Sequence, residues 1–467
     1  MYKRESMPVR NGGSMSQKRL VVVGGNAAGL AAASQARRRN PDLSILVLEQ
    51  SPFISFSACG FPYFLSGDIP DFNSLFIRSP EFFRRERKIE VLTRHRVVSL
   101  DPSAHLVTAH DQEKGEERTF DYERLILATG ARALSGDFLK GSLPGIFAIR
   151  RAENALALVG FLLARKPSRA LVVGGSLLGL EMAEGLRKRG MEVTLAERST
   201  RLLPEFSEPF GEEVKKEMMR RGIQITFSSA VSSFTGEPES SLREAVLEDG
   251  RRLPCDLVVL ALGVAPDADL AQKAGIALGV GEAVATDRFL RTSASHIYAA
   301  GDCAALNNLV SGRETYFPRG TSANRSGRAA GEAAAGGEAD FPGVARTMAA
   351  RFFDLTVART GLDEKEARDF TSSLKVTDSR SRSRAGYFPG SEPVFTRVLF
   401  DGKSGLLLGA EMMGREGIAT RINTYAAALS ARMTVDDLSR LDLAYSPPLS
   451  PLWDPVLQSS GLAALEK

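Results

Sequence analysis

The chain has 467 residues, a length that exceeds one ordinary hydrophobic core and predicts two or three domains. Its 60 basic and 56 acidic residues leave a net charge of +4, which is too small to indicate a nucleic-acid surface. Three cysteines in so long a chain, none at metal-ligand spacing, argue against a disulfide framework or a metal site and indicate a reducing compartment. We therefore expect a cytoplasmic globular protein.

Neither a membrane span nor a targeting signal is expected. No apolar run approaches the roughly 18 residues that cross a bilayer, and residues 1–17 lack the hydrophobic core of a signal peptide. We interpret residues 1–17 as a disordered leader, with Met15 as an alternative start. Two arginine-rich runs, 37–39 and 84–88, suit either an anionic ligand or a solvated helix face, and the solvated face is favoured.

An internal repeat dominates the first 200 residues. Leu20–Val23, followed by GGNAAG from Gly24 on, recurs 150 residues later as Ala170–Val173, followed by GGSLLG from Gly174 on. Each unit predicts a buried strand, a tight glycine turn and the start of a helix made of small residues. Backbone N–H groups and the helix dipole can receive a pyrophosphate at such a turn.

An acid completes each unit, because Glu49 and Glu197 end the second predicted strand of their units. They follow the first glycine by 25 and 23 residues, near the ~20 expected of a carboxylate that holds an adenosine ribose. Asn26 and Ser176 stand where the strict pattern has its middle glycine, so the closest phosphate contacts stay open. Two complete units favour two dinucleotide sites over structural turns without a ligand.

Further strands belong to the same two units. An apolar segment ends in Thr129–Gly130 after the first unit, and Cys255–Gly263 is its counterpart after the second. Later the segment 292–302 ends in Asp302, after a strand and just before a predicted helix. An acid there can accept a ribityl hydroxyl of a flavin, although an N-cap aspartate is an equally common interpretation.

Cys59 is the most informative single residue. It lies ten residues after Glu49, in SFSACGFPYFLSG, and Cys255 and Cys303 are far away in sequence. Any redox chemistry at this position therefore uses one thiol. Residues 57–60 are typical of the start of a helix, whose dipole can lower the pKa of a thiol and hold the nucleophilic thiolate. A buried structural cysteine is the alternative.

The pattern changes after about residue 340. A strand at 405–411 and a helix from about 421 to 432 predict a mixed α/β domain without a third glycine turn. The segment YSPPLSP opens with Tyr445 and is a proline-fixed loop. It is either a surface linker or a rigid support for that tyrosine.

With these motifs the chain resembles the FAD-dependent pyridine nucleotide-disulfide oxidoreductases over residues 18–460. Within that family it is similar to the single-cysteine branch, and it resembles the coenzyme A-disulfide reductases. The segments that carry the resemblance are GGNAAG with Glu49, SFSACGFPY, Ala128–Gly130, GGSLLGLE with Glu197, Tyr298–Asp302, AGYFPG and YSPPLSPLWDP. The resemblance implies an NAD(P)H:disulfide oxidoreductase, in which hydride passes from the nicotinamide through FAD to Cys59. Its implied substrate is coenzyme A disulfide, or a coenzyme A persulfide or polysulfide.

The implied fold class is α/β, with two Rossmann-like three-layer nucleotide-binding domains and a C-terminal α/β dimerisation domain. The expected bounds are 18–144 with 266–340 for the FAD-binding domain, 145–265 for the NAD(P)-binding domain and 341–467 for the dimerisation domain. FAD and either NADH or NADPH are the expected cofactors.

The resemblance assigns two sets of cofactor contacts. The expected FAD contacts are Gly24, Asn26, Ala28, Gly29, Glu49, Gln50, Ser57, Thr129, Gly130 and Asp302. The expected NAD(P) contacts are Gly174, Ser176, Leu178, Gly179, Glu181, Glu197, Arg198 and Gly263. NADH is favoured over NADPH because Glu197 can accept from a ribose 2′-hydroxyl and repels a 2′-phosphate, although Arg198 directly follows it.

The resemblance also implies a coenzyme A site and a homodimer with shared active sites. The expected coenzyme A contacts are Gln35, Arg38, Phe83 and Arg87. Tyr387, in AGYFPG, and Tyr445 match catalytic tyrosines that reach the partner subunit's Cys59. Their implied role is to donate a proton to, or hydrogen bond with, the leaving coenzyme A thiolate. Coenzyme A is either a substrate moiety or a bound ligand.

Other functions stay open. NADH oxidases and peroxidases carry a histidine where Ala27 stands, which disfavours an oxygen or peroxide acceptor. Persulfide reductases of this branch often append a rhodanese domain, for which we expect this chain to be too short; a partner protein or an inorganic polysulfide would then serve. The remaining alternative is a flavin-bearing redox sensor with little turnover.

Overall fold

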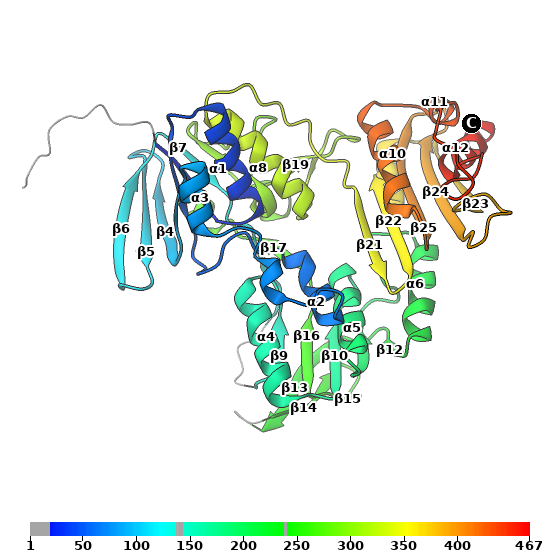
Figure 1. Cartoon of the computed structure of the whole chain (residues 1–467), viewed down its shortest axis with the longest axis horizontal. Helices are drawn as coiled ribbons and strands as arrows, with labels where there is room; N and C mark the ends of the chain where they lie inside the picture. Colours follow the sequence, from blue (N-terminus) through cyan, green and yellow to red (C-terminus); the bar gives the residue numbers. More distant parts are fainter. Residues whose placement is uncertain (1–18, 137, 139–142, 238–240) are drawn as a thin grey trace, which may run out of the picture.

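A computed structural model describes residues 19–136, 138, 143–237 and 241–467 (Figure 1). The predicted leader, residues 1–17, lies outside the described residues. Three five-stranded sheets organise the described chain. Two of them are parallel and follow the sequence repeat, and the third is antiparallel and lies towards the C-terminus.

The first parallel sheet forms the core of the N-terminal region. Its strands, in spatial order, are β18 (Ile297–Ala299), β7 (Arg124–Leu127), β1 (Arg19–Val23), β2 (Ser44–Leu48) and β3 (Glu90–Leu92). Strands β1, β2 and β7 are apolar and almost wholly buried, as expected of a sheet that is covered on both faces. The helices of this region are α1 (Ala27–Arg39), α3 (Pro80–Arg87) and α8 (Gly320–Ala334). An antiparallel sheet of β4 (His95–Asp101), β5 (Leu106–Asp111) and β6 (Glu116–Asp121) lies beside it.

The second parallel sheet repeats the first strand by strand. Its strands, in spatial order, are β9 (Ile146–Ala148), β16 (Leu257–Leu260), β10 (Arg169–Val173), β11 (Glu192–Ala196) and β12 (Ile223–Thr226). β10 takes the place of β1, β11 of β2 and β16 of β7, so the sequence repeat is a repeat of the fold. The helices here are α4 (Ala152–Arg165), α5 (Leu177–Lys188) and α6 (Glu208–Arg220). A small antiparallel sheet joins β13 (Val231–Glu237), β14 (Ser241–Leu247) and β15 (Arg252–Pro254).

Two crossing segments connect these regions. β8 (Ala131–Ala133) leaves the first region and pairs antiparallel with β17 (Val264–Pro266), which returns to it. The other short elements are η1 (Ala58–Gly60), α2 (Phe61–Ser66), η2 (Phe72–Leu75), α7 (Asp269–Lys273), η3 (Val280–Glu282), η4 (Gly301–Cys303), β19 (Leu306–Asn307) and β20 (Glu314–Thr315).

The C-terminal region has an antiparallel sheet with helices packed against it (Figure 1). Its strands, in spatial order, are β21 (Met348–Phe352), β22 (Leu355–Gly361), β25 (Leu407–Gly414), β24 (Pro393–Asp401) and β23 (Leu374–Arg382). Its helices are α9 (Glu364–Phe370), α10 (Ile418–Ser430), α11 (Val435–Ser439) and α12 (Pro455–Leu465). The strand expected at 405–411 and the helix expected at about 421–432 correspond to β25 and α10. The predicted α/β fold class is confirmed, and the domain bounds stay predictions.

Helices α1 and α8 pack closely, although nearly 300 residues separate them. A Cβ atom on Gly327 would lie 2.3 Å from Ala28 O, and one on Gly331 would lie 2.1 Å from Ala32 O. Both distances are far below van der Waals contact, so only glycine fits at these two positions of α8. This contact fixes the start of α1, which is the start of the first nucleotide-binding turn.

Candidate active site

The first glycine turn has the geometry that its sequence predicts. Gly24 adopts a φ of +116°, and a Cβ there would lie 2.1 Å from Ala128 O. Gly29 is equally constrained, because its Cβ would lie 1.8 Å from Gly24 O. Asn26 has a φ of −120°, which accommodates a side chain, so the missing middle glycine does not distort the turn. Helix α1 begins directly after it and aims its first N–H groups into the cleft.

The second turn repeats this geometry. Gly174 has a φ of +110°, with Ala261 O at 2.4 Å from a Cβ placed there. A Cβ on Gly179 would lie 2.0 Å from Gly174 O. Ser176 has a φ of −76° and, like its counterpart, needs no glycine. The two turns therefore have the same backbone conformation and the same close contacts.

Each acid ties its glycine turn to its second strand. Glu49 accepts hydrogen bonds from Gly25 N at 2.6 Å and Ser51 N at 2.7 Å. Glu197 accepts from Gly175 N at 2.6 Å and from Ser199 N at 2.7 Å. Burial raises the pKa of Glu49, while its two backbone bonds favour the ionised form. Both carboxylates thus support the turn in addition to any contact with a ribose.

A cleft of about 1300 Å³ opens between the two parallel sheets. Nine of the ten expected FAD contacts line it: Gly24, Asn26, Ala28, Glu49, Gln50, Ser57, Thr129, Gly130 and Asp302. The tenth, Gly29, lies beneath the turn and acts through its small size. From the second unit, the cleft is lined by Ser176, Leu178, Glu181 and Gly263.

The other expected NAD(P) contacts lie away from this cleft. Arg198 lines a separate pocket of about 370 Å³, together with Ser228, Ser229 and Glu248. Gly174, Gly179 and Glu197 shape the second glycine turn and line neither space. The second unit therefore faces the main cleft at one end and a smaller polar pocket at the other.

Cys59 lines the main cleft and is exposed, whereas Cys255 and Cys303 are free and fully buried. It lies in the 3₁₀ turn η1, just before α2. The expectation that a helix start lowers its pKa is wrong. Although part of Cys59 is exposed to solvent, desolvation by the surrounding walls of the cleft is the main cause that raises the pKa of its thiol. The Glu181 carboxylate raises this pKa further, and Arg319 opposes the shift. A six-residue helix supplies little dipole to oppose these effects.

Asp302 is positioned by a turn, and no long helix begins directly after it. It lies in η4, directly after β18, and α8 begins only at Gly320, which corrects the predicted helix. One carboxylate oxygen forms an ion pair with Arg150. The other, Oδ1, is buried and has no hydrogen-bond partner among the described residues. A buried acceptor without a donor is costly, so this oxygen fits a hydroxyl group supplied by a ligand.

The residues of this cleft fit a flavin dinucleotide. The turn and the start of α1 offer backbone N–H donors for a pyrophosphate, Glu49 stands at the ribose end, and Asp302 Oδ1 offers an acceptor further along. No group of three or more metal-ligating side chains was found among the described residues. Nor does the described part of the chain contain a helix long and apolar enough to cross a membrane.

Tyr387 and Tyr445 meet in the C-terminal region. Their hydroxyl oxygens lie 3.2 Å apart, and the side chains are 76% and 45% exposed. This hydrogen bond is the main reason that the pKa of Tyr445 is raised. Neither tyrosine lines the cleft that holds Cys59 of its own subunit. The structure thus pairs the two predicted catalytic tyrosines but keeps them away from that thiol.

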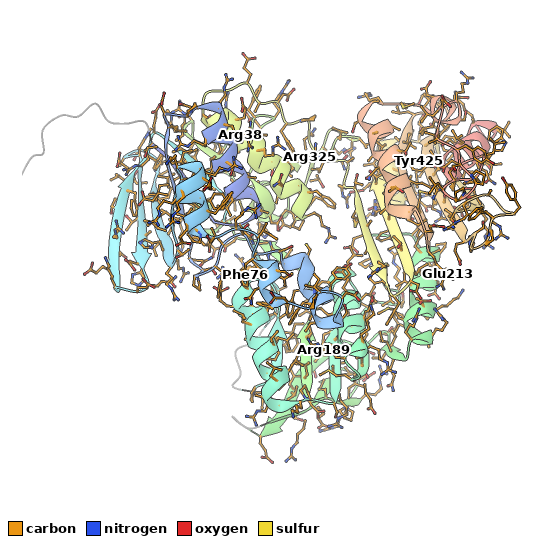
Figure 2. All side chains as sticks on the ribbon, in the orientation of Figure 1. Arg38, Phe76, Arg189, Glu213, Arg325 and Tyr425 are labelled. Carbon is orange, nitrogen blue, oxygen red and sulfur yellow. The ribbon has the colours of Figure 1, made fainter. Side chains whose placement is uncertain are left out.

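The predicted coenzyme A contacts gather where α1 meets α3 and α8. Arg38 donates to Gln35 Oε1, and burial, followed by the neighbouring charges of Arg328 and Arg87, lowers the pKa of Arg38. Phe83 lies instead in the core, at 5% exposure. Figure 2 shows Arg38 on α1 near Arg325 on α8. The guanidinium groups of Arg38, Arg87 and Arg328 thus lie near one another, a positive cluster that suits an anion. One carboxylate, that of Glu332, lies in the same cluster and accepts from Gln35.

Three residues near the predicted sites were missed. Tyr63 and Arg319 line the cleft with Cys59, and Arg328 joins the arginine cluster on α1 and α3. Tyr63 follows Cys59 by one helical turn, a spacing that could have indicated it. Arg319 and Arg328 come from a segment more than 200 residues away, and nothing local in the sequence points to the cleft.

Comparison with known proteins agrees with this geometry. The family described as "Pyridine nucleotide-disulphide oxidoreductase" matches residues 18–330, and its dimerisation domain matches residues 347–455. The chain is 32% identical over 439 residues to an NADH oxidase from Methanocaldococcus jannaschii, covering 94% of this chain and 97% of that one.

A second relative is the NAD(P)H sulfur oxidoreductase (CoA-dependent) of Pyrococcus furiosus, which is 31% identical over 95% of this chain and 98% of its own. Among solved structures, reduced Bacillus anthracis CoADR-RHD superposes with a TM-score of 0.92 at 31% identity, over 97% of this chain and 81% of that chain. These matches extend across both nucleotide-binding units and the C-terminal region. The chain belongs to the pyridine nucleotide-disulphide oxidoreductase family.

Proposed function

We propose that the protein is an NAD(P)H-dependent flavoprotein that reduces coenzyme A disulfide, or a coenzyme A persulfide or polysulfide, through Cys59. One observation carries this proposal: the exposed cysteine lies in the cleft onto which both glycine turns open. The coenzyme A moiety is supported by the arginine cluster around Arg38 and by the name of the Pyrococcus relative.

The chemistry divides between the cofactors and the chain. When bound at the first turn, FAD supplies two electrons taken from NAD(P)H held at the second. The thiolate of Cys59 attacks one sulfur of the substrate, forms a mixed disulfide and releases the other sulfur as a thiolate that takes up a proton. The two electrons would then cleave this mixed disulfide, release the second sulfur as a thiolate and regenerate Cys59. Because surrounding groups raise the pKa of Cys59, this thiol must lose its proton before it can attack the substrate.

The activity test is a comparison of wild type with Cys59→Ser. Serine cannot form the mixed disulfide, so the variant should keep flavin and nicotinamide binding and lose reduction of coenzyme A disulfide. Flavin reduction by NADH, followed by stopped-flow absorbance, should survive. Cys255→Ser is the matched control, because Cys255 is buried outside the cleft. Reduction of coenzyme A disulfide by Cys59→Ser at the wild-type rate would falsify the proposal.

The shared active site is a further part of the proposal. Tyr387 and Tyr445 are exposed, and so are Leu449, Leu452 and Trp453, each of which is more than 60% exposed. An apolar exposed patch of this kind indicates a protein contact surface, and the matched dimerisation domain makes a second copy its occupant. Across such a dimer, the tyrosine pair would donate a proton to, or hydrogen bond with, the coenzyme A thiolate that is released as the partner subunit's Cys59 forms its mixed disulfide.

Mixed dimers test this arrangement. Tyr445→Phe should slow coenzyme A disulfide reduction by about 10²-fold, the usual loss when a general acid is removed, and should leave flavin reduction by NADH nearly unchanged. Dimers of one Cys59→Ser subunit and one Tyr445→Phe subunit should regain one complete site. Mixed dimers that form and stay as inactive as their parents would show that the sites are not shared.

NADH oxidation by oxygen is the second candidate, supported by the name of the Methanocaldococcus relative. Ala27 is the first residue of α1. The NADH oxidases and peroxidases that this sequence resembles carry a histidine at that position. Consumption of NADH that depends on oxygen, and not on coenzyme A disulfide, would favour this candidate. A redox sensor would show flavin reduction with neither acceptor consumed.

A further inference from the structure

Two opposite charges share the cleft with Cys59. Glu181 reaches it from α5, and Arg319 reaches it from the residue that precedes α8. The carboxylate disfavours the thiolate, and the guanidinium favours it. Arg150 and Asp302 also act on the thiol, but they form an ion pair with each other, which reduces their net effect. Glu181 and Arg319 are therefore the charges that act on the thiol without cancelling in an ion pair with each other.

One face of α5 holds Glu181 against the helix that follows Cys59. Residues 181, 185 and 189 are four apart and so share that face. A Cβ on Gly185 would lie 3.0 Å from Pro62 O, and Arg189, labelled just after α5 in Figure 2, donates to Leu65 O at 2.7 Å. Helix α5 thus packs directly on α2, and Glu181 lines the same cleft as the thiol.

Several groups decide the charge of Glu181. Arg319 and Tyr63 of α2 both favour the ionised form of its carboxyl group and lower its pKa. Burial, and then Glu184 on the same helix, oppose ionisation and raise the pKa of Glu181 to about 7. Arg351 of β21 lies over the Tyr63 ring, with its guanidinium 6.0 Å from the ring centroid. The carboxyl therefore changes charge near neutral pH.

Arg319 is anchored to the second region. Its guanidinium lies 3.5 Å from Glu205 Oε1, and its Nε is buried without a hydrogen-bond partner among the described residues. The backbone oxygen of Glu205 accepts in turn from Arg359 of β22. The positive charge is thus held at the junction of all three regions, and one ion pair at 3.5 Å leaves it available to the thiol.

We infer that Glu181 and Arg319 are opposed positioning residues for Cys59, with Glu181 holding the neutral thiol and Arg319 favouring the thiolate. Ionisation of Glu181 and of Cys59 is then linked, because each negative charge makes the other harder to form. As pH rises, Glu181 ionises near pH 7 and pushes the ionisation of Cys59 to higher pH. This inference rests on the proposed redox role of Cys59 and names what controls that thiol.

Alkylation of Cys59 in the FAD-loaded protein tests the inference without turnover. Iodoacetamide reacts with the thiolate, so its rate follows the ionised fraction. Rates are measured by intact mass between pH 5 and pH 10, and the buried Cys255 and Cys303 serve as internal controls that should not react. In wild type the rate should rise over a broader pH range than a single titration allows.

The two variants should shift this profile in opposite directions. Glu181→Gln should move its midpoint down by about one pH unit, the usual effect of removing one near like charge, and should narrow it to a single titration. Arg319→Gln should move the midpoint up by a similar amount, and Arg319→Lys should stay near wild type. Combining Glu181→Gln with Arg319→Gln should bring the midpoint back towards the wild-type value.

Two further variants keep the test decisive. Glu213→Gln makes the same change on α6, where Glu213 pairs with Lys216 on the surface, and should leave the profile unchanged (Figure 2). If Glu181→Gln loses its flavin, Tyr63→Phe replaces it, because loss of the hydroxyl keeps Glu181 neutral to higher pH and should lower the midpoint by a smaller amount.

The outcomes separate this inference from the proposed function. The inference is supported if the alkylation midpoints of Glu181→Gln and Arg319→Gln shift in opposite directions from wild type. It is overturned if the profiles of the two variants coincide or shift in the same direction. An inactive Cys59→Ser with unshifted alkylation profiles would retain the redox thiol and reject its control by Glu181 and Arg319. An active Cys59→Ser would reject the redox role, whatever the alkylation shows.

Discussion

The two glycine turns share a backbone and differ in the residue that comes after each acid. Gly24 and Gly174 adopt nearly the same positive φ, and Glu49 and Glu197 accept from the next glycine N–H at the same 2.6 Å. After the first acid, Gln50 lines the main cleft, whereas Arg198 lines the separate pocket after the second. The backbone is thus common to both turns, whereas the side chain after each acid faces a different space.

The largest difference between the two turns should appear when the first glycine of each turn is substituted. Gly24→Val would place Cβ 2.1 Å from Ala128 O at a positive φ, so the protein should lose its flavin and about 2 kcal/mol or more of unfolding free energy. Gly174→Val should keep the flavin and lose most of its reduction by NADH. Flavin content, denaturant unfolding and stopped-flow absorbance measure the three quantities.

A control separates backbone strain from the close contact in these variants. Gly250 also has a positive φ, of +84°, but nothing lies within 4 Å of a Cβ placed there. Gly250→Val should therefore cost only the strain and should retain both activities. Flavin retained by Gly24→Val would contradict the steric argument for the first turn.

Asp302 allows a test that is specific to the nucleotide site of the first turn, because its buried oxygen without a hydrogen-bond partner lies in the cleft of that turn. Asp302→Asn should weaken FAD binding by about 1–3 kcal/mol, since an amide cannot both accept at Oδ1 and keep the charge that pairs with Arg150. Flavin release after dilution, followed by fluorescence, gives the dissociation constant. Asp256→Asn breaks a comparable ion pair with Arg169 outside the cleft and should leave that constant unchanged.

A smaller effect is expected when the acids lose their charge. Glu197→Gln should raise the kcat/KM ratio of NADPH to NADH about tenfold, because the carboxylate no longer repels a 2′-phosphate. Glu49→Gln should leave this ratio unchanged. Steady-state kinetics with both nucleotides provide the measurement, and equal ratios in the two variants would show that the second acid does not select the nucleotide.

The smallest effect should come from the residue after each acid. Arg198→Gln should lower kcat/KM for NADPH by about threefold, in keeping with a partly exposed charge, and should leave kcat/KM for NADH nearly unchanged. Gln50→Ala is the matched change after the first acid and should alter neither value. A loss with NADH equal to the loss with NADPH would place Arg198 at a phosphate common to both.

The sequence predicted the parts of the site that depend on local backbone. Positive φ at Gly24 and Gly174, the strands before them and the acids after them all follow from short patterns, because a turn of this kind tolerates few residues. The charge state of Cys59 could not be predicted in this way. It depends on burial and on Glu181 and Arg319, which tertiary packing brings to the thiol from distant segments.

Phe83 and Asp302 show the same limit. An aromatic residue on an amphipathic helix can face either way, and only the packing of α3 shows that Phe83 is in the core. The residues that directly follow Asp302 contain no helix breaker before Gly312, yet the segment folds as a 3₁₀ turn and a short β-hairpin before α8 begins. Long-range pairing with β7 and α1 decides these positions, and a local pattern contains no information on it.

The glycine contact between α1 and α8 has a consequence for the order of folding. The second parallel sheet has all its strands once residue 260 has been made, whereas the first needs β18 and then α8, which ends at residue 334. During synthesis on the ribosome, the inserted unit can therefore close while the unit that surrounds it is still incomplete. Until Gly331 leaves the exit tunnel, the side of α1 that α8 covers has no partner, although α1 can already pack on β1, β2 and β7. The segment that is made first is thus among the last to reach its final packing.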